Sequence, residues 1–176
     1  MYKTSKVKFQ QKNTDIKKLS AEKVVDILFD LFKPKSVIDV GCGTGLLLKY
    51  FQSKGSKIMG YEGKWINKDL IDENISNKVV KIIDFEQLEL LKTEESEMCI
   101  CLEVAEHISF NQADNFVEFI SLHSKLIIFS AAIPNQGGFN HINEQWSDFW
   151  DSKFLKFGYI KSVSYTHLTL PTNREV

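Results

Sequence analysis

Residues Ser36 to Gly45 read SVIDVGCGTG, and the rest of the chain can be placed around this stretch. Its first five residues are mostly apolar and predict a short buried strand. Three glycines follow at alternate positions, beginning with Gly41 and Gly43, and they let the backbone turn tightly and let a ligand approach it. The apolar run at 46–48 can open a helix with free N–H groups at its start. A strand, a glycine turn and a helix in this order are typical of a nucleotide-type binding site.

The spacing of the glycines favours one kind of nucleotide. A dinucleotide fingerprint, G-x-G-x-x-G, would place its third glycine at Leu46, but here that glycine comes one residue earlier. Asp39 lies two residues before the first glycine. This D-x-G-x-G-x-G pattern resembles motif I of the class I S-adenosylmethionine-dependent methyltransferases, and the alternative is a glycine-rich turn without a ligand. The resemblance implies that S-adenosylmethionine is the cofactor and that the residues of this turn bind it: Asp39, Gly41, Cys42, Gly43 and Gly45.

The next two predicted strands each end in an acidic residue. Glu62 and Gly63 follow the second strand, about 20 residues after the first glycine, where a carboxylate can accept hydrogen bonds from ribose hydroxyls. NAD-binding proteins use the same position, so Glu62 does not separate the two cofactors. Asp84 and Phe85 follow the third strand and match a family pattern in which the acid receives the adenine amino group and the next residue packs on the ring. The alternatives are a solvated loop glutamate at Glu62 and a simple strand-end turn at Asp84.

The fourth predicted strand is followed by the sequence EVAEHI. The run 98–102 is continuously apolar, as expected for a central strand buried on both faces. The block after it resembles one found in small-molecule methyltransferases, which places Glu103 near the cofactor. His107 is a candidate general base, with a hydrogen-bonded structural histidine as the alternative. Glu106 is interpreted as structural.

A loop with proline and glycine follows the fifth predicted strand, in a position suited to substrate contacts. It carries His141, the second candidate base. A helix predicted over 144–157 has an aromatic face that we expect to pack on the core. This face comprises Trp146, Phe149, Trp150 and Phe154.

Length, net charge and cysteine content limit the classes of protein to which this chain can belong. The chain has 176 residues, enough for one domain with a core, and its net charge of −1 favours neither nucleic acid nor an anionic membrane as a partner. We place Cys99 and Cys101 on opposite faces of a strand, which suits neither a disulfide nor a zinc pair, and expect buried free thiols in a reducing cytoplasm. We find no ligand cluster that requires a metal. No signal peptide or membrane span is predicted.

The segment boundaries follow from these patterns. Residues 1–19 are polar and basic and are interpreted as a flexible lead-in, with Ser20 capping the first helix and Pro34 ending it. Residues 20–162 form the predicted methyltransferase domain. Residues 163–176 resemble a translated sequencing-library adapter and are interpreted as a non-native tail, with a real C-terminal strand as the alternative. The other expected elements are strands at 57–61, 79–83 and 125–133, a sixth strand from Tyr159, and helices at 46–54 and 111–122.

Together these patterns predict an α/β fold: a Rossmann-like three-layer sandwich with a mostly parallel sheet whose last strands are missing or non-native. The resemblance covers residues 20–161 and implies methyl transfer from S-adenosylmethionine to an unidentified small molecule, at oxygen or nitrogen. An NAD-type oxidoreductase and a non-catalytic cofactor-binding fragment are the alternatives. The oligomeric state is left open.

Overall fold

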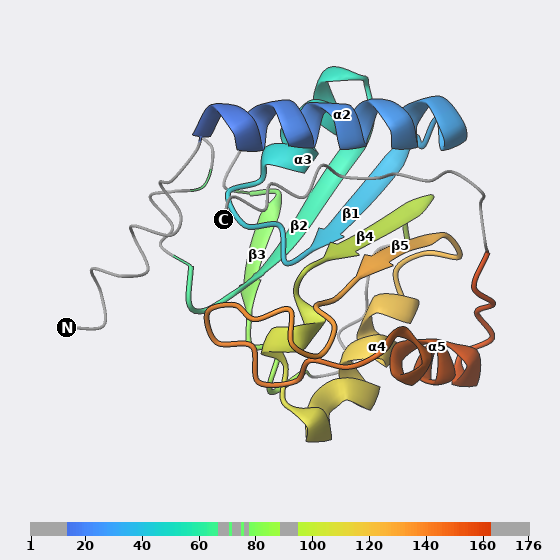
Figure 1. The fold of residues 1–176 in the computed structure, drawn as a ribbon. Helices are drawn as coiled ribbons and strands as arrows, with labels where there is room; N and C mark the ends of the chain where they lie inside the picture. The colour runs from blue at the N-terminus through green and yellow to red at the C-terminus, as the bar shows by residue number, and fades with distance from the viewer. Residues whose placement is uncertain (1–13, 67–70, 72–74, 76–77, 89–94, 163–176) are drawn as a thin grey trace.

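A five-stranded sheet, parallel throughout, forms the centre of the molecule in the computed structural model (Figure 1). The structure describes residues 14–66, 71, 75, 78–88 and 95–162. The strand order is β3-β2-β1-β4-β5. The strands are β1 (Ser36–Val40), β2 (Lys57–Gly63), β3 (Val80–Ile83), β4 (Met98–Leu102) and β5 (Ile127–Ser130).

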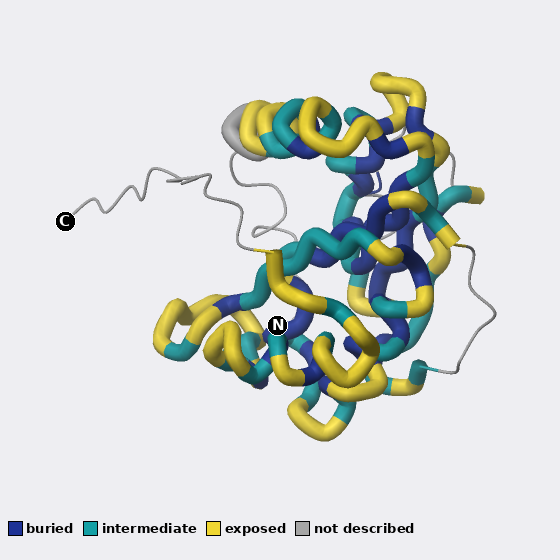
Figure 2. The backbone as a smooth tube through the Cα atoms, turned by 90° about the vertical axis from the view of Figure 1, so that its right-hand side faces the viewer, coloured by how far each residue is buried: buried dark blue, intermediate teal, exposed yellow. Residues whose placement is uncertain are grey.

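Helices cover both faces of the sheet, which confirms the predicted three-layer sandwich (Figure 1). Helices α2 (Thr14–Phe32) and α3 (Leu46–Ser53) lie over one face, and α4 (Ala113–Ser121) and α5 (Ser147–Lys156) over the other. Two short 3-10 helices, η2 (Ala105–His107) and η3 (Phe110–Gln112), connect β4 to α4. The buried stretches of the chain follow the sheet, and the exposed ones gather on the outer sides of the helices and loops (Figure 2).

Side chains that alternate along the central strands divide the core between the two faces. On β4, Met98 and Ile100 pack with α2 and α3, whereas Cys99 and Cys101 pack with α4 and α5. Cys99 and Cys101 therefore lie on the same face, and the expectation that they point to opposite faces is wrong, because side chains two residues apart share a face. Both thiols, and that of Cys42, are buried and free as expected.

The strand order places a site at one edge of the sheet. From β1 the chain runs outward to β2 and β3, and then crosses to the other side of β1 to form β4 and β5. Ligands of open α/β sheets bind at such a reversal, in the crevice beyond the carboxyl ends of the strands. Here these ends lead into the glycine turn after Val40 and the segment that begins at Glu103.

Several boundaries differ from the sequence-based expectations. Helix α2 begins at Thr14, so Ser20 lies inside it and does not cap it. Residues 159–162 form no strand. Instead, the Tyr159 hydroxyl lies 2.9 Å from the Ser121 carbonyl and 2.5 Å from the Ser124 carbonyl, which attaches this segment to the end of α4. The proposed tail at 163–176 lies outside the described residues.

The aromatic face of α5 is only partly as predicted. Trp150 is buried, and Phe149 and Phe154 pack against the same core cluster. Trp146 precedes the helix and is 60% exposed, so its assignment to the core is wrong. Among the helices of the described residues, none combines the length and the apolar character needed to cross a membrane.

Two leucines on the same side of the sheet provide a test of this core. Leu48 on α3 is fully buried, whereas Leu31 on α2 is 57% exposed. We expect Leu48→Ala to lower the free energy of unfolding by about 2–5 kcal/mol, because it removes buried methyl groups and leaves a cavity. Leu31→Ala should change it by less than about 0.5 kcal/mol. Urea unfolding of both variants measures the difference, and equal losses would contradict the described packing.

Candidate active site

The glycine turn after β1 packs directly against the segment after β4. Gly41, Gly43 and Gly45 all have positive φ, at 82°, 55° and 80°. A Cβ atom on Gly41 would lie 2.2 Å from a methyl group of Val104, so only glycine allows this approach. A Cβ atom on Gly43, by contrast, would meet nothing within 4 Å. The turn therefore closes on the protein at Gly41 and leaves space beside Gly43.

Glu62 holds this turn from the neighbouring strand. Its carboxylate accepts hydrogen bonds from the backbone N–H of Gly43, at 2.5 Å, and of Gly63, at 2.8 Å. The residue is buried, and burial raises the pKa of its carboxyl group although the two N–H donors act in the opposite direction. The predicted binding residue thus lies beside the glycine turn, at the carboxyl end of β2.

Asp39 lies beneath the turn rather than in front of it. It is 3% exposed and pairs in register with Gly60 of β2 and Ile100 of β4. Burial, and then the charge of Glu62, raise the pKa of Asp39 to about 7. Cys42, at the bend of the turn, has a thiol pKa raised by burial and then by Asp39, so it acts as a small apolar residue there.

The acid after β3 is held by neighbouring groups. Asp84 accepts hydrogen bonds at 3.0 Å from the Lys64 ammonium and from the backbone N–H of Glu86. The hydrogen bond from Lys64 is the main reason that the pKa of Asp84 is lowered, so the group is a carboxylate at neutral pH. It stands at the carboxyl edge of the sheet, as the sequence predicts.

Phe85 lies deeper than a residue that lines a ligand site. It is fully buried, with its ring centre 5.5 Å from that of Phe116. Trp65, which is 42% exposed, lies against Phe85 with a ring separation of 5.6 Å. The same indole covers Gly63, where a Cβ atom would lie 2.3 Å from the ring. Trp65 is therefore the aromatic side chain that reaches the surface here, and the adenine contact of Phe85 stays a prediction.

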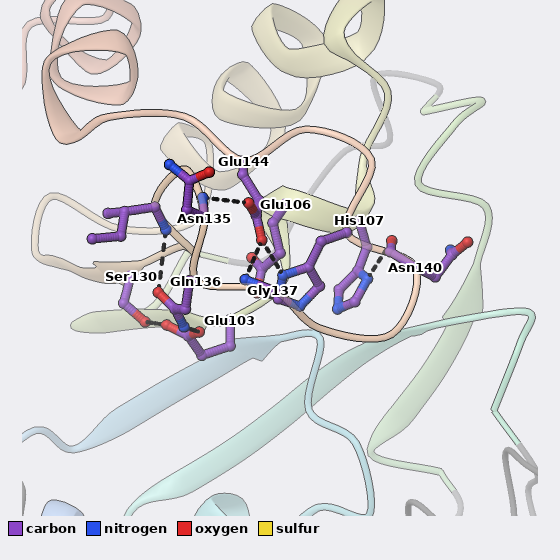
Figure 3. A network of polar contacts seen from close by, with 11 residues as sticks. Glu103, Glu106, His107, Ser130, Asn135, Gln136, Gly137, Asn140 and Glu144 are labelled. Carbon is purple, nitrogen blue, oxygen red and sulfur yellow. Dashed lines mark hydrogen bonds and ion pairs between the residues drawn. The ribbon is translucent and has the colours of Figure 1, made fainter. Parts of the chain in front are cut away.

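The segment after β4 begins with a strained residue. Glu103 has a φ of 56°, in the left-handed region that residues with side chains seldom adopt. Its carboxylate accepts hydrogen bonds from the Ser130 hydroxyl at 2.7 Å and the Gln136 side-chain amide at 3.3 Å (Figure 3). It thus connects the end of β4 to the end of β5 and the loop that follows. Such strain is concentrated at functional sites.

Glu106 and the two candidate bases come together beyond β4. Glu106 is 0% exposed, and its two carboxylate oxygens have no hydrogen-bond partner among the described residues. One of these oxygens lies 3.8 Å from Nε2 of His141. The rings of His107 and His141 meet edge to face with their centres 5.0 Å apart. Glu106, interpreted from the sequence as structural, thus lies next to both histidines.

Backbone contacts fix the loop that carries His141. The carbonyl oxygen of Glu106 accepts hydrogen bonds from the N–H groups of Ile142 and Asn143, both at 3.0 Å. The Glu144 carboxylate accepts from the N–H groups of Asn135 at 3.0 Å and Gly137 at 2.9 Å. The loop consequently curves around Glu106 (Figure 3).

Both histidines are oriented through Nδ1. In His107 this nitrogen lies 3.0 Å from the carbonyl oxygen of Asn140, and in His141 it lies 3.0 Å from Oε1 of Glu144. A carbonyl can only accept a hydrogen bond. The hydrogen bond from His141 is the main reason that the pKa of Glu144 is lowered, so this group is an acceptor too. Each Nδ1 therefore carries the hydrogen, and each neutral ring has its lone pair on Nε2.

The sequence did not predict this cluster. One carboxylate oxygen of Glu106 and one ring nitrogen each of His107 and His141 all lie within 4.8 Å of one another. From the sequence we found no ligand cluster that requires a metal, whereas the structure shows three residues whose geometry could hold one. Glu144, which orients His141, was also missed, although its spacing in H-x-x-E was a signal that could have found it.

A family model described as "Methyltransferase domain" matches residues 13–175. The chain belongs to this methyltransferase family. Both the glycine turn and the EVAEHI block lie inside the matched region.

The individual proteins that resemble this methyltransferase have low sequence identity to it. Protein 235L of Invertebrate iridescent virus 6, whose name assigns it to the methyltransferases, is 25% identical over 167 residues; the match covers 88% of this chain and 60% of that protein. A methyltransferase structure from Archaeoglobus fulgidus superposes with a TM-score of 0.61 at 19% identity, covering 80% and 68% of the two chains. Human N-acetylserotonin methyltransferase superposes with a TM-score of 0.58 at 16% identity, covering 85% and 49%. These structures show the shared fold.

The buried Asp39 makes stability depend on pH. Its pKa of about 7 in the folded protein lies above the usual value of 3.8, so the folded state holds a proton that the unfolded state releases between these values. This group therefore stabilises the fold below pH 4 and loses that contribution as the pH rises to 7. In urea unfolding, Asp39→Asn should gain stability relative to the parent protein between pH 5 and pH 7, by at most about 1.4 kcal/mol per pH unit. A difference that stays constant with pH would contradict the protonated state.

Proposed function

We propose that this methyltransferase transfers a methyl group from S-adenosylmethionine to an oxygen or nitrogen atom of a small molecule. The observation that carries the proposal is the glycine turn, which leaves space beside Gly43 and has its N–H bound to the Glu62 carboxylate. Membership of the methyltransferase family supports the reaction class. The human N-acetylserotonin methyltransferase that shares the fold is described in complex with S-adenosylmethionine, which supports the cofactor.

The residues of the site suit this cofactor. The space beside Gly43 would admit the amino-acid end of the molecule next to exposed backbone. Glu62 would accept hydrogen bonds from the ribose hydroxyls, and Asp84 from the adenine amino group. The exposed ring of Trp65 would offer an apolar surface near the adenine.

The protein itself has few chemical tasks in this reaction. S-adenosylmethionine would supply a methyl group that is already activated by a sulfonium. The chain must hold the acceptor in line with that methyl group and keep water away. The segment after β4 and the loop after β5 stand at the same edge as the glycine turn and would do this.

His107 or His141 would take a proton from an acceptor that needs deprotonation. Because Nδ1 of each ring donates to a fixed acceptor, Nε2 is the basic atom in both. His141 is held by the Glu144 carboxylate, whereas His107 is held by a backbone carbonyl. An acceptor that is already nucleophilic would be methylated without a base.

Calorimetric titration with S-adenosylmethionine tests the cofactor site. Gly43→Ala should weaken binding at least tenfold, because its methyl group fills the space beside the turn. Gly55→Ala is the matched control: Gly55 also has a positive φ and open space around it, but it precedes β2 at the other edge of the sheet. Glu62→Gln should also weaken binding at least about tenfold through loss of a charged hydrogen-bond acceptor.

The outcomes separate the alternatives. A folded protein that does not bind S-adenosylmethionine would contradict the proposal. Binding of NAD in its place would favour an oxidoreductase. Equal effects of Gly43→Ala and Gly55→Ala would show that the cofactor does not lie beside the glycine turn.

A further inference from the structure

The cluster formed by Glu106, His107 and His141 has the composition of a metal site. Two neutral imidazoles and one carboxylate are ligands of zinc and other divalent first-row transition ions. The three residues come from two segments, η2 and the loop after β5, that are held together by hydrogen bonds from Ile142 and Asn143 to the Glu106 carbonyl. The fold therefore brings these ligands together without help from an ion.

The hydrogen bonds of the two histidines leave Nε2 of each ring available to a ligand. Hydrogen bonds to the Asn140 carbonyl and the Glu144 carboxylate keep the hydrogen of each ring on Nδ1. The free lone pair is then on Nε2, and in His141 this atom is the one that lies 3.8 Å from the Glu106 carboxylate. Metal-binding histidines are held in this way, with the second ring nitrogen bonded to a carbonyl or carboxylate.

Glu106 is the independent observation that points to a ligand. Its side chain is 1% exposed, and neither carboxylate oxygen has a hydrogen-bond partner among the residues described. A buried polar group without a partner is costly, and a buried charge is usually paired or bound to a metal. No donor from His141 satisfies it, because the hydrogen of that ring is directed to Glu144.

The distances agree with a site that closes slightly on binding. Ligand atoms around a zinc-sized ion lie about 3.0–3.5 Å apart, given metal–ligand bonds of about 2.1 Å. The three candidate atoms lie within 4.8 Å of one another, and one pair is at 3.8 Å. Shifts of about 1 Å in side-chain position would bring them to bonding distance.

We infer that Glu106, His107 and His141 bind a divalent transition-metal ion. Three protein ligands leave at least one coordination position open, as in catalytic rather than structural sites. Resting on the proposed function, the open position takes an oxygen of the methyl acceptor, so the acceptor class is a hydroxyl compound. With the metal bound, both histidines act as ligands through Nε2 and neither acts as the base. In the transfer, the acceptor oxygen forms the new bond to the methyl carbon, the sulfur–methyl bond breaks with its electron pair left on sulfur, and the hydroxyl proton passes to water.

Calorimetry on the untagged full chain, with Zn²⁺, Mn²⁺ or Mg²⁺ added alone, tests the site. We expect one equivalent of Zn²⁺ to bind more tightly than Mn²⁺, and Mn²⁺ more tightly than Mg²⁺. Glu106→Gln and His107→Gln should each weaken Zn²⁺ binding at least tenfold. Glu144→Gln, which loosens His141 without removing a ligand, should weaken it about 10–100-fold.

The control is Glu95→Gln, an exposed glutamate before β4 at the opposite edge of the sheet, which should leave metal binding unchanged. Circular dichroism shows that each variant is folded. Failure of the folded parent protein to bind any of the three ions would overturn the inference, as would equal Zn²⁺ affinity in the parent, Glu106→Gln and His107→Gln. A parallel titration with S-adenosylmethionine keeps the two proposals apart. Cofactor binding without metal binding overturns only the metal site. Metal binding without cofactor binding overturns the proposed function, and with it the acceptor class, but not the metal site.

Discussion

The close contact between Gly41 and Val104 determines how the site is assembled. The glycine turn follows β1 and the EVAEHI block follows β4, and these strands are neighbours at the point where the strand order reverses. A side chain at position 41 would collide with Val104, so a glycine there lets the two segments touch. One segment carries the proposed cofactor site and the other carries Glu106 and His107. Their contact places both at one edge of the sheet, as transfer between two bound molecules requires.

The sequence predicted those parts of the fold that depend on local patterns. The limits of β4 were predicted correctly because a continuous apolar run with polar ends has one interpretation in a central parallel strand. The start of α2 was missed because its first residues are polar and show no apolar periodicity, although polar residues are compatible with helix. The strand expected from Tyr159 was wrong because the Tyr159 hydroxyl bonds to carbonyls at the end of α4, a tertiary contact that no local pattern shows.

The same distinction between local patterns and tertiary contacts applies to the site. The positions of Glu62 and Asp84 follow from strand ends and were predicted. Whether a residue at such a position reaches a ligand depends on what packs around it, so Phe85 could match the family pattern and still be buried beneath Trp65. His107 and His141 were each proposed singly. The two histidines lie together because backbone groups far apart in the sequence are hydrogen-bonded to each other. No local sequence pattern shows such a contact.

The charges at this edge of the sheet indicate what kind of ligand it favours. Asp39 and Glu62 are both buried beside the glycine turn, and the charge of Glu62 contributes to the raised pKa of Asp39. Repulsion from Glu62 is one reason that Asp39 keeps its proton, and a positively charged ligand beside the pair would favour the ionised form of Asp39 without a change in the fold. The sulfonium of S-adenosylmethionine is such a charge. Because NAD-binding proteins also carry an acid at the position of Glu62, the choice against a dinucleotide rests on the spacing of the glycines.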